Sequence, residues 1–308
     1  MPEMHSLLSV ITCAHNPRRD YLDRVIEALG NQTLASDRWE YLLVDNASQQ
    51  PLAGQADLSW HPNARHLREE KLGLTYARLR SIRESSGAIL IFVDDDNVLD
   101  ADYLEQVEEI AGKWPLIGAW AGQTRPGFES PPRDWTREYW GRLVIREFDQ
   151  DRWSNQPADD RAMPYGAGMC VRRRVADHYA YLHASGRRRI LLDRVGESLI
   201  SGGDSDLAIC ACDLGLGMGL FTSLKLTHLI PEARLTEDYL VRLVEGLACS
   251  SVLLSSFRSN NGGPSSPKLS TAAADVVRLL IRNRRERRFF RAVRNGERKA
   301  AKLLRNNH

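Results

Sequence analysis

Three consecutive aspartates, Asp94, Asp95 and Asp96, follow an apolar run at residues 88–93. That run has the length and composition of a buried strand, so the three anions should lie together where the strand ends. Carboxylates this close repel one another, and their pKa values rise unless a cation lies among them. Hard oxygen ligands suit Mg²⁺ or Mn²⁺, which typically also bind substrate phosphates. The run predicts a divalent-metal site; the alternatives are a solvated acidic turn or the cap of a following helix.

Two further predicted strands end in polar residues. The apolar run 7–12 is followed by Cys-Ala-His-Asn at 13–16, and the run 41–44 by Asp-Asn-Ala-Ser at 45–48. Helical segments are predicted at 21–29, 74–85 and 103–111. Strands alternating with helices predict an α/β fold with a mostly parallel, Rossmann-like sheet flanked by helices. In such sheets ligands bind beyond the carboxyl ends of the strands, so the three polar segments should converge on one edge.

The order and spacing of these segments resemble those of family 2 glycosyltransferases with the GT-A fold, over roughly residues 6–240. The segments that carry the resemblance are Leu8–Thr12 with Asn16, Val44–Ser48, Leu72–Leu74 with Ala77 and Arg78, and Phe92–Asp96. They are similar, in that order, to the family's opening strand, its Val-Asp-Asp-Gly-Ser segment, the segment before the metal motif, and the Asp-x-Asp metal motif. The resemblance implies an enzyme that transfers a sugar from a nucleotide-sugar donor.

On the nucleotide side, the resemblance implies that Asp45 hydrogen-bonds the base of the donor. Thr12 and Asn16 are expected beside the same nucleotide. The chain departs from the family here, because Asn46 stands where the family has a second aspartate and Ala47 where it has glycine. The first change keeps polarity, whereas the second puts the geometry of the turn in question.

On the diphosphate side, the resemblance implies that Arg78 lies near the phosphates, which suit a guanidinium. Asp94 is expected toward the ribose and sugar, Asp95 beside the donor nucleotide, and Asp96 is expected to ligate Mn²⁺ or Mg²⁺. His228 stands alone among apolar residues at 226–231. Some family members have a histidine metal ligand at this place, although an isolated histidine in an apolar stretch is usually a hydrogen-bonded core residue.

A second acidic motif, Gly-Gly-Asp-Ser-Asp-Leu, occupies residues 202–207. The family often has Gly-Glu-Asp-x-Asp-Leu here, which implies that Asp204 is the base that deprotonates the acceptor hydroxyl. Gly203 replaces the family's glutamate. The alternative is that Asp204 and Asp206 only cap a helix over 207–212.

Three residues are expected on the donor-sugar or acceptor side. Gly168 belongs to a small-residue segment at 165–169 that resembles the family's segment beside the donor sugar, although tight strand packing would also explain it. Trp135 could stack on a sugar ring or be a core residue. Asp206 is expected on the same side.

The charge distribution separates the C-terminal end from the rest of the chain. The chain has 308 residues and a net charge of +2, and residues 278–305 hold twelve Arg or Lys and two Glu. That stretch carries +10, which leaves −8 for the remainder. Apolar residues group at 276, 277, 280 and 281 and again at 289, 290 and 293, which is helical spacing. The stretch could lie on an anionic membrane surface or pack on the acidic body or a second subunit; nucleic acid is a weaker alternative.

Composition also bears on the compartment. The five cysteines are odd in number and lie in apolar stretches, which favours a reducing compartment. The first residues lack the pattern of a secretory signal, and no run of about 18 uninterrupted apolar residues occurs. We therefore expect a cytoplasmic protein, with the inner face of the membrane as a possible peripheral site and no membrane-spanning helix.

The expected organisation is a glycosyltransferase domain at 1–258, a linker at 259–268 and a basic helical tail at 269–308. Within the domain, 1–111 would bind the nucleotide and 112–258, beginning with loops and short helices at 112–160, would face the acceptor. The expected reaction is inverting, metal-assisted transfer to a glycan, lipid-linked or small-molecule acceptor hydroxyl, in glycan or cell-envelope biosynthesis, with UDP as the carrier by family habit. The alternatives are a phosphatase of the haloacid dehalogenase type, because Asp94-x-Asp96 also fits its nucleophile pattern, and an inactive sugar-binding module, because Gly203 replaces glutamate.

Overall fold

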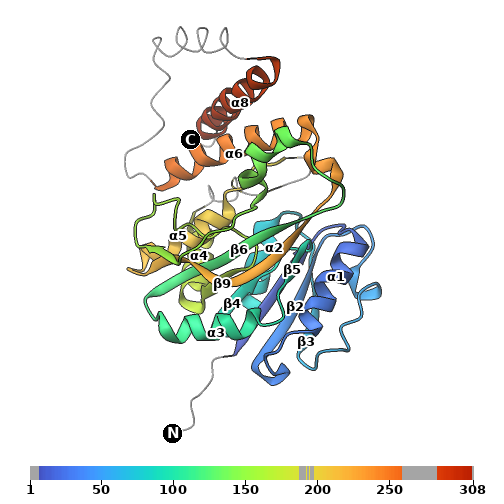
Figure 1. The fold of residues 1–308 in the computed structure, drawn as a ribbon. Coiled ribbons are helices and arrows are strands. Elements are labelled where there is room, and N and C mark those ends of the chain that lie inside the picture. Colours follow the sequence, from blue (N-terminus) through green and yellow to red (C-terminus); the bar gives the residue numbers. More distant parts are fainter. Residues whose placement is uncertain (1–6, 187–191, 193, 195–197, 259–282, 307–308) are drawn as a thin grey trace. The chain divides into compact units, whose positions relative to one another are not determined.

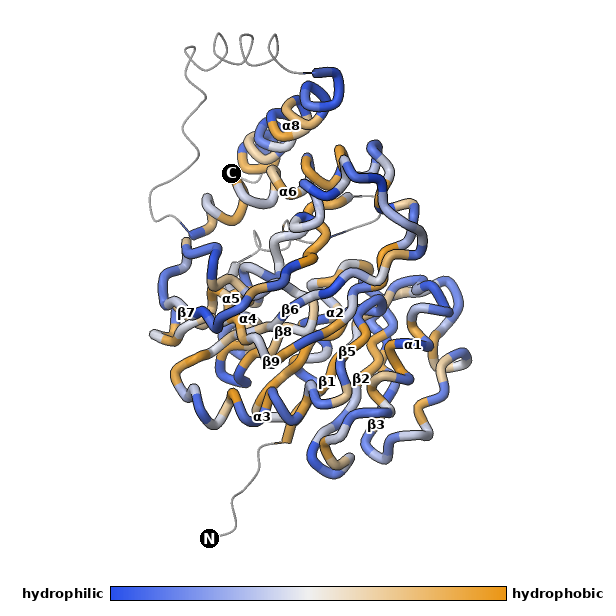
Figure 2. The backbone as a smooth tube through the Cα atoms, viewed as in Figure 1, coloured by the Kyte–Doolittle hydropathy of each residue, from blue (hydrophilic) through white to orange (hydrophobic). Residues whose placement is uncertain are grey.

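The computed structural model describes residues 7–186, 192, 194, 198–258 and 283–306. These residues include a nine-stranded sheet with strand order β3-β2-β1-β4-β8-β6-β9-β5, and β7 pairs with β9 beside this path; its strands are labelled between Figure 1 and Figure 2. The first four strands in that order are parallel to one another. β8 runs antiparallel to both β4 and β6, whereas β6 and β9 are parallel, so the second half of the sheet is mixed. The strands are β1 (Leu8–Ala14), β2 (Trp39–Asn46), β3 (Ala64–Glu69), β4 (Ile89–Phe92), β5 (Asn97–Leu99), β6 (Ile117–Phe128), β7 (Arg152–Ser154), β8 (Met169–Arg172) and β9 (Gly217–Ile230).

Helices alternate with the parallel strands, as the sequence predicted. In chain order they are α1 (Arg19–Gly30), α2 (Leu74–Glu84), α3 (Tyr103–Lys113), α4 (Arg173–Ser185), α5 (Gly203–Asp213), α6 (Glu237–Arg258) and α8 (Arg284–Asn306). Short 3-10 helices include η1 (Ser36–Arg38), η2 (Leu52–Gly54), η3 (Asp134–Leu143) and η5 (Glu232–Leu235). One core cluster joins the apolar faces of α1 and α3 to alternate residues of β1, β2 and β4, while α2 contacts β1, β2 and β3. Alternation along the strands thus fills both faces of the sheet.

The strand β6 corrects the expectation of loops and short helices at 112–160. Glycines at 118, 122 and 127 and Pro126 gave this stretch the composition of a loop, yet it forms a 12-residue strand. The glycines are needed for packing: a Cβ at Gly122 would lie 2.1 Å from the carbonyl oxygen of Leu224 on β9. This close approach coincides with an irregularity in the β6–β9 register between Ala121 and Gln123.

The described residues form two compact units, one made of residues up to 185 together with 204–232, and one made of 186–203 together with 233–308. The sheet and its helices belong to the first unit. The second unit contains α6, which the sequence placed in the glycosyltransferase domain, and α8, the basic helix. The expected linker at 259–268 lies outside the described residues, as does the apolar group at 276–281.

Helix α6 is long and apolar enough to cross a membrane, judged by length and composition alone. The sequence did not predict such a helix, because Arg242 and Glu245 interrupt its run of apolar residues. Of its most apolar 18-residue window, 39% is buried inside the protein. One such helix is weak evidence, since a core helix passes the same test.

Within the second unit, α6 and α8 lie side by side (Figure 1). Cys249 and Leu253 of α6 pack with Ala300 and Leu304 of α8 in one apolar cluster. Gly296 is required at this contact, because a Cβ there would lie 2.2 Å from the carbonyl oxygen of Glu245. The two backbones therefore touch, and the buried face of α8 is fixed.

Candidate active site

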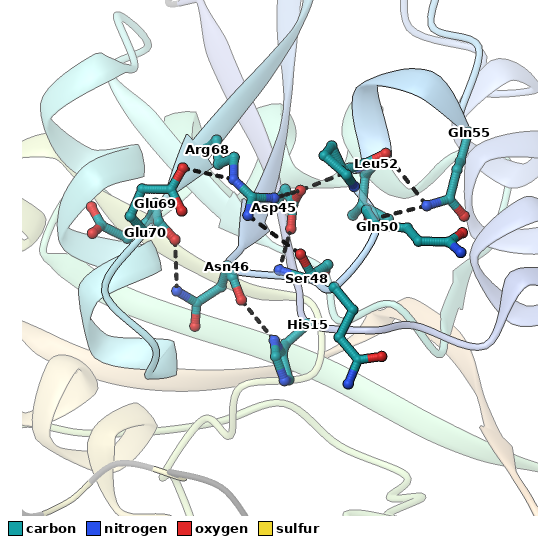
Figure 3. A network of polar contacts seen from close by, with 12 residues as sticks. His15, Asp45, Asn46, Ser48, Gln50, Leu52, Gln55, Arg68, Glu69 and Glu70 are labelled. Carbon is teal, nitrogen blue, oxygen red and sulfur yellow. Dashed lines mark hydrogen bonds and ion pairs between the residues drawn. The ribbon is translucent and has the colours of Figure 1, made fainter.

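Asp45 ends β2 and is held by the loop that follows it (Figure 3). Its carboxylate accepts hydrogen bonds from the backbone N–H of Ser48 (2.9 Å) and of Leu52 (3.1 Å), and pairs with Arg68 of β3 (2.6 Å). Burial alone would raise the pKa of Asp45, but the hydroxyl and N–H of Ser48, the N–H of Leu52 and Arg68 lower it below its usual value. Asp45 is therefore a buried anion whose charge is already balanced within the chain.

Asn46 explains one departure from the family's motif. Its amide nitrogen donates to the carbonyl oxygens of Glu69 (3.2 Å) and Lys71 (2.8 Å), and its amide oxygen accepts the N–H of Gly73 (2.8 Å). An aspartate could accept from Gly73 but could not donate to the two carbonyls. Asn46 thus ties the end of β2 to the segment that enters α2, and the amide is required by these partners.

The loop after β1 is tied to the loop after β2. The His15 ring contacts the carbonyl oxygen of Asn46 through Nδ1 at 2.7 Å. Asn16 donates its backbone N–H to the Ser48 hydroxyl (2.9 Å), and its side-chain oxygen accepts the N–H of Gln49 (2.9 Å). Asn16 has φ = 46°, a left-handed conformation that asparagine tolerates well.

Ala47, which stands where the family has glycine, adopts a left-handed conformation. Its φ is 53°, in a region where the Cβ of alanine is disfavoured. The hydrogen bonds on both sides of it hold this conformation. The turn, whose geometry the sequence left in question, is thus left-handed at Ala47, at the expense of local strain.

The aspartate run lies beyond β4, in a turn closed by a hydrogen bond from the N–H of Asn97 to the carbonyl oxygen of Asp94 (3.0 Å). Asp94 and Asp95 are half-buried and Asp96 is buried. Burial, followed by the charges of Asp96 and Asp204, raises the pKa of Asp94 to about 6, although Arg78 and His228 oppose the rise. The mutual repulsion that the sequence implied is therefore present.

His228 of β9 lies against Asp96, and the structure brings these two predicted metal ligands together. The His228 Nε2 atom is 3.4 Å from Asp96 Oδ2, and its Nδ1 atom is 2.9 Å from the carbonyl oxygen of Leu143. An Nδ1–H donated to that carbonyl leaves the lone pair of Nε2 facing the carboxylate. Two ligands about 2.1 Å from one ion, in neighbouring octahedral positions, would be about 3 Å apart.

Asp96 and His228 thus fit two neighbouring ligand positions of a Mn²⁺ or Mg²⁺ ion. In the described part of the chain, no group of three or more His, Cys, Asp or Glu side chains is arranged to hold a metal. These ions usually take few protein ligands and complete their coordination with substrate phosphates and water. A site with two protein ligands is therefore compatible with an ion that binds together with a diphosphate.

Arg78 of α2 forms an ion pair with Asp204, the first acidic residue of α5. The Arg78 side chain is 3% exposed and that of Asp204 is 24% exposed. Burial would lower the pKa of Arg78, but the carboxylates of Asp204 and Asp94 outweigh it and raise the pKa. One buried arginine therefore links the two acidic motifs, which are far apart in the sequence.

Gly166 lies directly against the base candidate. A Cβ at this position would lie 2.4 Å from a carboxylate oxygen of Asp204. The glycine thus lets the backbone approach the carboxylate. The sequence offered Gly166 and Gly168 together but gave no means of choosing between them.

The remaining predicted residues are less well placed to contact a ligand. Thr12 is fully buried and Asp206 is 1% exposed, so neither side chain presents accessible atoms in this conformation. Gly168 has φ = 66°, and its Cα faces the hydroxyl of Tyr103, which favours the packing interpretation. Trp135 is half-buried in η3 and packs on Tyr139, with the ring centroids 6.1 Å apart.

Two site residues were missed from the sequence, Arg68 and Gly166. Arg68 lies on β3, which the sequence did not predict as a strand, so its register opposite Asp45 could not be known. The one available signal was its charge, a cation near the predicted strand end of β2. Gly166 required the position of α5, which only the folded chain provides.

Comparisons with known proteins define the class of protein. The family model described as glycosyl transferase family 2 matches residues 9–179. Glycosyltransferase AglE of Haloferax volcanii is 32% identical over 109 residues, which is 34% of this chain and 36% of that protein. The chain therefore matches about a third of the length of this relative.

Solved structures share the fold over nearly the whole chain. The mannosyltransferase PcManGT of Pyrobaculum calidifontis, solved with GDP-Man and Mn²⁺, has a TM-score of 0.59 at 15% identity and covers 97% of this chain and 88% of its own. TarS 1–349 of S. aureus has a TM-score of 0.52 at 13% identity, with 98% and 92% covered. These likenesses confirm the expected GT-A-type α/β fold with a C-terminal helix.

Because the family model covers more than half of the chain, the protein belongs to glycosyl transferase family 2. This membership makes it a glycosyltransferase. Membership of this family, together with the fold, rules against the haloacid dehalogenase alternative that Asp94-x-Asp96 left open.

Proposed function

We propose that the protein is an inverting, metal-assisted transferase that moves a sugar from a UDP-sugar to an acceptor hydroxyl in glycan or cell-envelope biosynthesis. The observation that carries the proposal is the convergence of two pairs around Asp94. Asp94 interacts electrostatically with both pairs, one made of Asp96 and His228 with 3.4 Å between Oδ2 and Nε2, the other of Arg78 and Asp204. Such an arrangement suits a donor diphosphate beside a base.

Asp96 and His228 would hold Mn²⁺ or Mg²⁺ together with oxygens of the donor diphosphate. When bound, the ion would neutralise the leaving diphosphate as a Lewis acid. It would also relieve the repulsion that raises the pKa of Asp94. Asp94 and Asp95 would face the ribose and sugar, and the buried Arg78 would add positive charge beside the phosphates.

Asp204 would remove the proton from the acceptor hydroxyl as that oxygen attacks the anomeric carbon. Its side chain is 24% exposed, so an acceptor can reach it, whereas Asp206 is buried. The ion pair with Arg78 fixes the position of the carboxylate. One base on the face opposite the leaving group gives inversion at the anomeric carbon.

The hydrogen-bond capacity of Asp45 supports a uracil base. A carboxylate offers about four acceptor positions, and protein donors fill them: two N–H groups, Arg68 and the Ser48 hydroxyl. Of these, the hydroxyl can turn its proton away without moving any heavy atom. One freed position suits the single imide N–H of uracil, whereas the guanine edge presents two kinds of N–H. TarS has been solved with UDP-GlcNAc, a donor of this type.

We place the reaction in the cytoplasm. Cys170, Cys210 and Cys249 are buried free thiols, which suits a reducing compartment. Glycan, lipid-linked and small-molecule acceptors are all compatible with an open base at the edge of the sheet.

The test is a panel of UDP-sugars and GDP-sugars incubated with the protein and Mn²⁺, with release of nucleoside diphosphate as the readout. We expect release from at least one UDP-sugar, loss of release with a chelator, and recovery when Mn²⁺ is restored. Asp23→Asn, a change of an exposed carboxylate on α1, is the matched control and should behave as the unaltered protein. Release from GDP-sugars alone would refute the uracil assignment, and release that survives the chelator would refute the role of the metal.

A further inference from the structure

The solvent-exposed face of α8 is mostly basic. Exposed Arg or Lys side chains recur at intervals of three, four and seven residues, the spacing of one helix face. The members of this basic stripe are Arg284, Arg287, Arg291, Arg298, Lys302 and Arg305, with Lys299 beside them. From the first to the last they extend about 32 Å at 1.5 Å per residue. Figure 2 shows the alternation of hydrophilic and hydrophobic residues along this helix.

The orientation of the stripe is fixed by the opposite face. Phe289, Ala292, Gly296, Ala300 and Leu304 are buried, and they lie about half a turn from the stripe. Because a Cβ at residue 296 would collide with α6, the helix cannot rotate about its axis without losing this contact. The packing of α8 therefore fixes the orientation of the basic stripe, which faces away from α6.

Three acidic residues near α8, Glu237, Asp238 and Glu297, pair with arginines outside the stripe. Glu237 pairs with Arg285 (3.2 Å) and Arg288 (2.5 Å), and neither arginine belongs to the stripe. Glu297 pairs with Arg294 at 2.7 Å. These ion pairs join α8 to α6 and to itself at the flanks of the stripe.

The start of α8 is also defined. Asn283 and Glu286 form a reciprocal capping box: the Glu286 N–H donates to Asn283 Oδ1 (2.9 Å), and the Asn283 N–H donates to Glu286 Oε2 (3.1 Å). Glu286 is thereby held at the cap. Its negative charge lies on the flank of the helix and does not interrupt the row of cations.

Like charges three and four residues apart destabilise an isolated helix. A row of them along one exposed face, with the acidic residues placed at the flanks, is a local disadvantage for folding that an anionic surface would offset. We propose that the basic stripe of α8 binds the anionic headgroups of a phospholipid membrane. The inference concerns the second unit alone and does not depend on the proposed reaction.

Two features favour a lipid surface over nucleic acid. The stripe is straight and lies along an anchored helix, which suits contact with a plane of headgroups. Of the two aromatic residues of α8, Phe289 is buried and Phe290 is half-buried with Arg294 over its ring at 5.5 Å, so neither presents an open face for base stacking. The basic stripe therefore offers positive charge but no open aromatic ring that could stack on a nucleotide base.

The experiment is co-sedimentation of the full chain with two kinds of vesicle, one of phosphatidylcholine alone and one with about 30% phosphatidylserine, an anionic lipid. We expect binding only to the anionic vesicles at about 0.1 M salt and loss of binding at about 1 M, where the Debye length is short. The variant Arg291→Glu/Arg298→Glu should weaken binding at least tenfold. Arg291→Lys/Arg298→Lys, which keeps the charge, should retain it.

The matched control is Arg83→Glu/Lys113→Glu, which changes the net charge by the same amount at exposed positions of the first unit. It should bind vesicles as the unaltered protein does. Circular dichroism establishes that each variant keeps its helix content. Equal binding to neutral and anionic vesicles, or equal loss in the control, overturns the proposal. So does tighter binding to a single-stranded RNA than to the anionic vesicles at the same salt concentration, because it would assign the stripe to nucleic acid.

Discussion

Two neighbouring parts of the sheet edge differ in whether the charge of their carboxylates is balanced by nearby cations and hydrogen-bond donors. In the nucleotide-side network, which comprises His15, Asn16, Asp45, Asn46, Ser48 and Arg68, the carboxylate of Asp45 is balanced by Arg68 and by backbone N–H groups. In the acidic cluster, which comprises Asp94, Asp96 and Asp204 with Arg78 and His228, the carboxylates outnumber the cations. The pKa of Asp45 is lowered accordingly, whereas that of Asp94 is raised to about 6.

We interpret the nucleotide-side network as a preformed scaffold, and the acidic cluster as a site that is stabilised when a cation binds. The network is satisfied without any ligand, so its bonds set the loop geometry before the donor arrives. The acidic cluster retains repulsion that a divalent cation would relieve. If this comparison is correct, changes in the cluster alter binding and turnover, while changes in the network alter stability first.

The largest effect is expected for Asp204→Asn. Loss of the base should lower turnover by about a thousandfold, within the usual range for general base catalysis. Donor binding should remain near normal, because the amide can still accept a hydrogen bond from Arg78. Turnover and the donor Kd are measured separately, by nucleotide release and by calorimetry, with Asp23→Asn as the matched control. Unchanged turnover would mean that Asp204 is not the base, and would contradict the view that changes in the acidic cluster alter turnover.

The next effect concerns the metal. His228→Ala should weaken Mn²⁺ binding in the presence of donor at least tenfold, because one of two protein ligands is lost. Titration of bound Mn²⁺ by electron paramagnetic resonance measures this directly, without reference to activity. His61→Ala removes another buried histidine, outside the cluster, and should leave the Mn²⁺ affinity unchanged. Equal Mn²⁺ affinity in His228→Ala and the unaltered protein would contradict the assignment.

A smaller effect, on stability, is expected for Asp45→Asn in the network. Removing the charge leaves Arg68 without its buried partner and places an N–H₂ group against N–H donors, which should destabilise the fold by about 2 kcal/mol. The pKa of Asp45 is lowered in the folded state, so its contribution is present above the unfolded pKa of about 3.9 and is lost as pH falls through the folded value. Urea unfolding at pH 7 and at pH 3 should show the difference from the unaltered protein shrinking at low pH. A constant difference would mean that the charge of Asp45 does not stabilise the fold.

Local patterns made much of this edge predictable from sequence. Asp94–Asp96, Asp45 and Asn16 follow apolar runs, and apolar runs of that length form strands whose ends must meet at one edge. His228 and Asp204 were identified only through the family's motifs. Their meeting with Asp96 and Arg78 depends on register across the sheet, such as Asn97 opposite His228, which no local pattern records.

The errors have physical causes as well. The sequence did not predict β6, because its glycines and proline are typical of a loop. In the structure, the glycines allow β9 to approach closely. Thr12 and Asp206 stay predictions, and their burial could not be known from the sequence. The sequence also gave no sign that apolar residues of α6 pack with those of α8, because the two helices are separated along the chain.

The smallest effect is expected for Ala47→Gly, and it tests whether the network stores strain. Ala47 has φ = 53°, and glycine adopts this conformation without the steric penalty of a Cβ. Part of the gain is offset by the greater entropy of glycine in the unfolded chain, so we expect stabilisation by about 0.5 kcal/mol. The matched control is Ala28→Gly in α1, where the same substitution should destabilise by up to about 1 kcal/mol.

Both variants are compared by urea unfolding, and turnover should stay unchanged in Ala47→Gly because the bonds of Asp45 and Asn16 already fix the turn. Destabilisation of Ala47→Gly would show that the turn is not strained. A stabilised variant with reduced turnover would show that the strain serves catalysis, and the network could then no longer be treated as a scaffold separate from the acidic cluster.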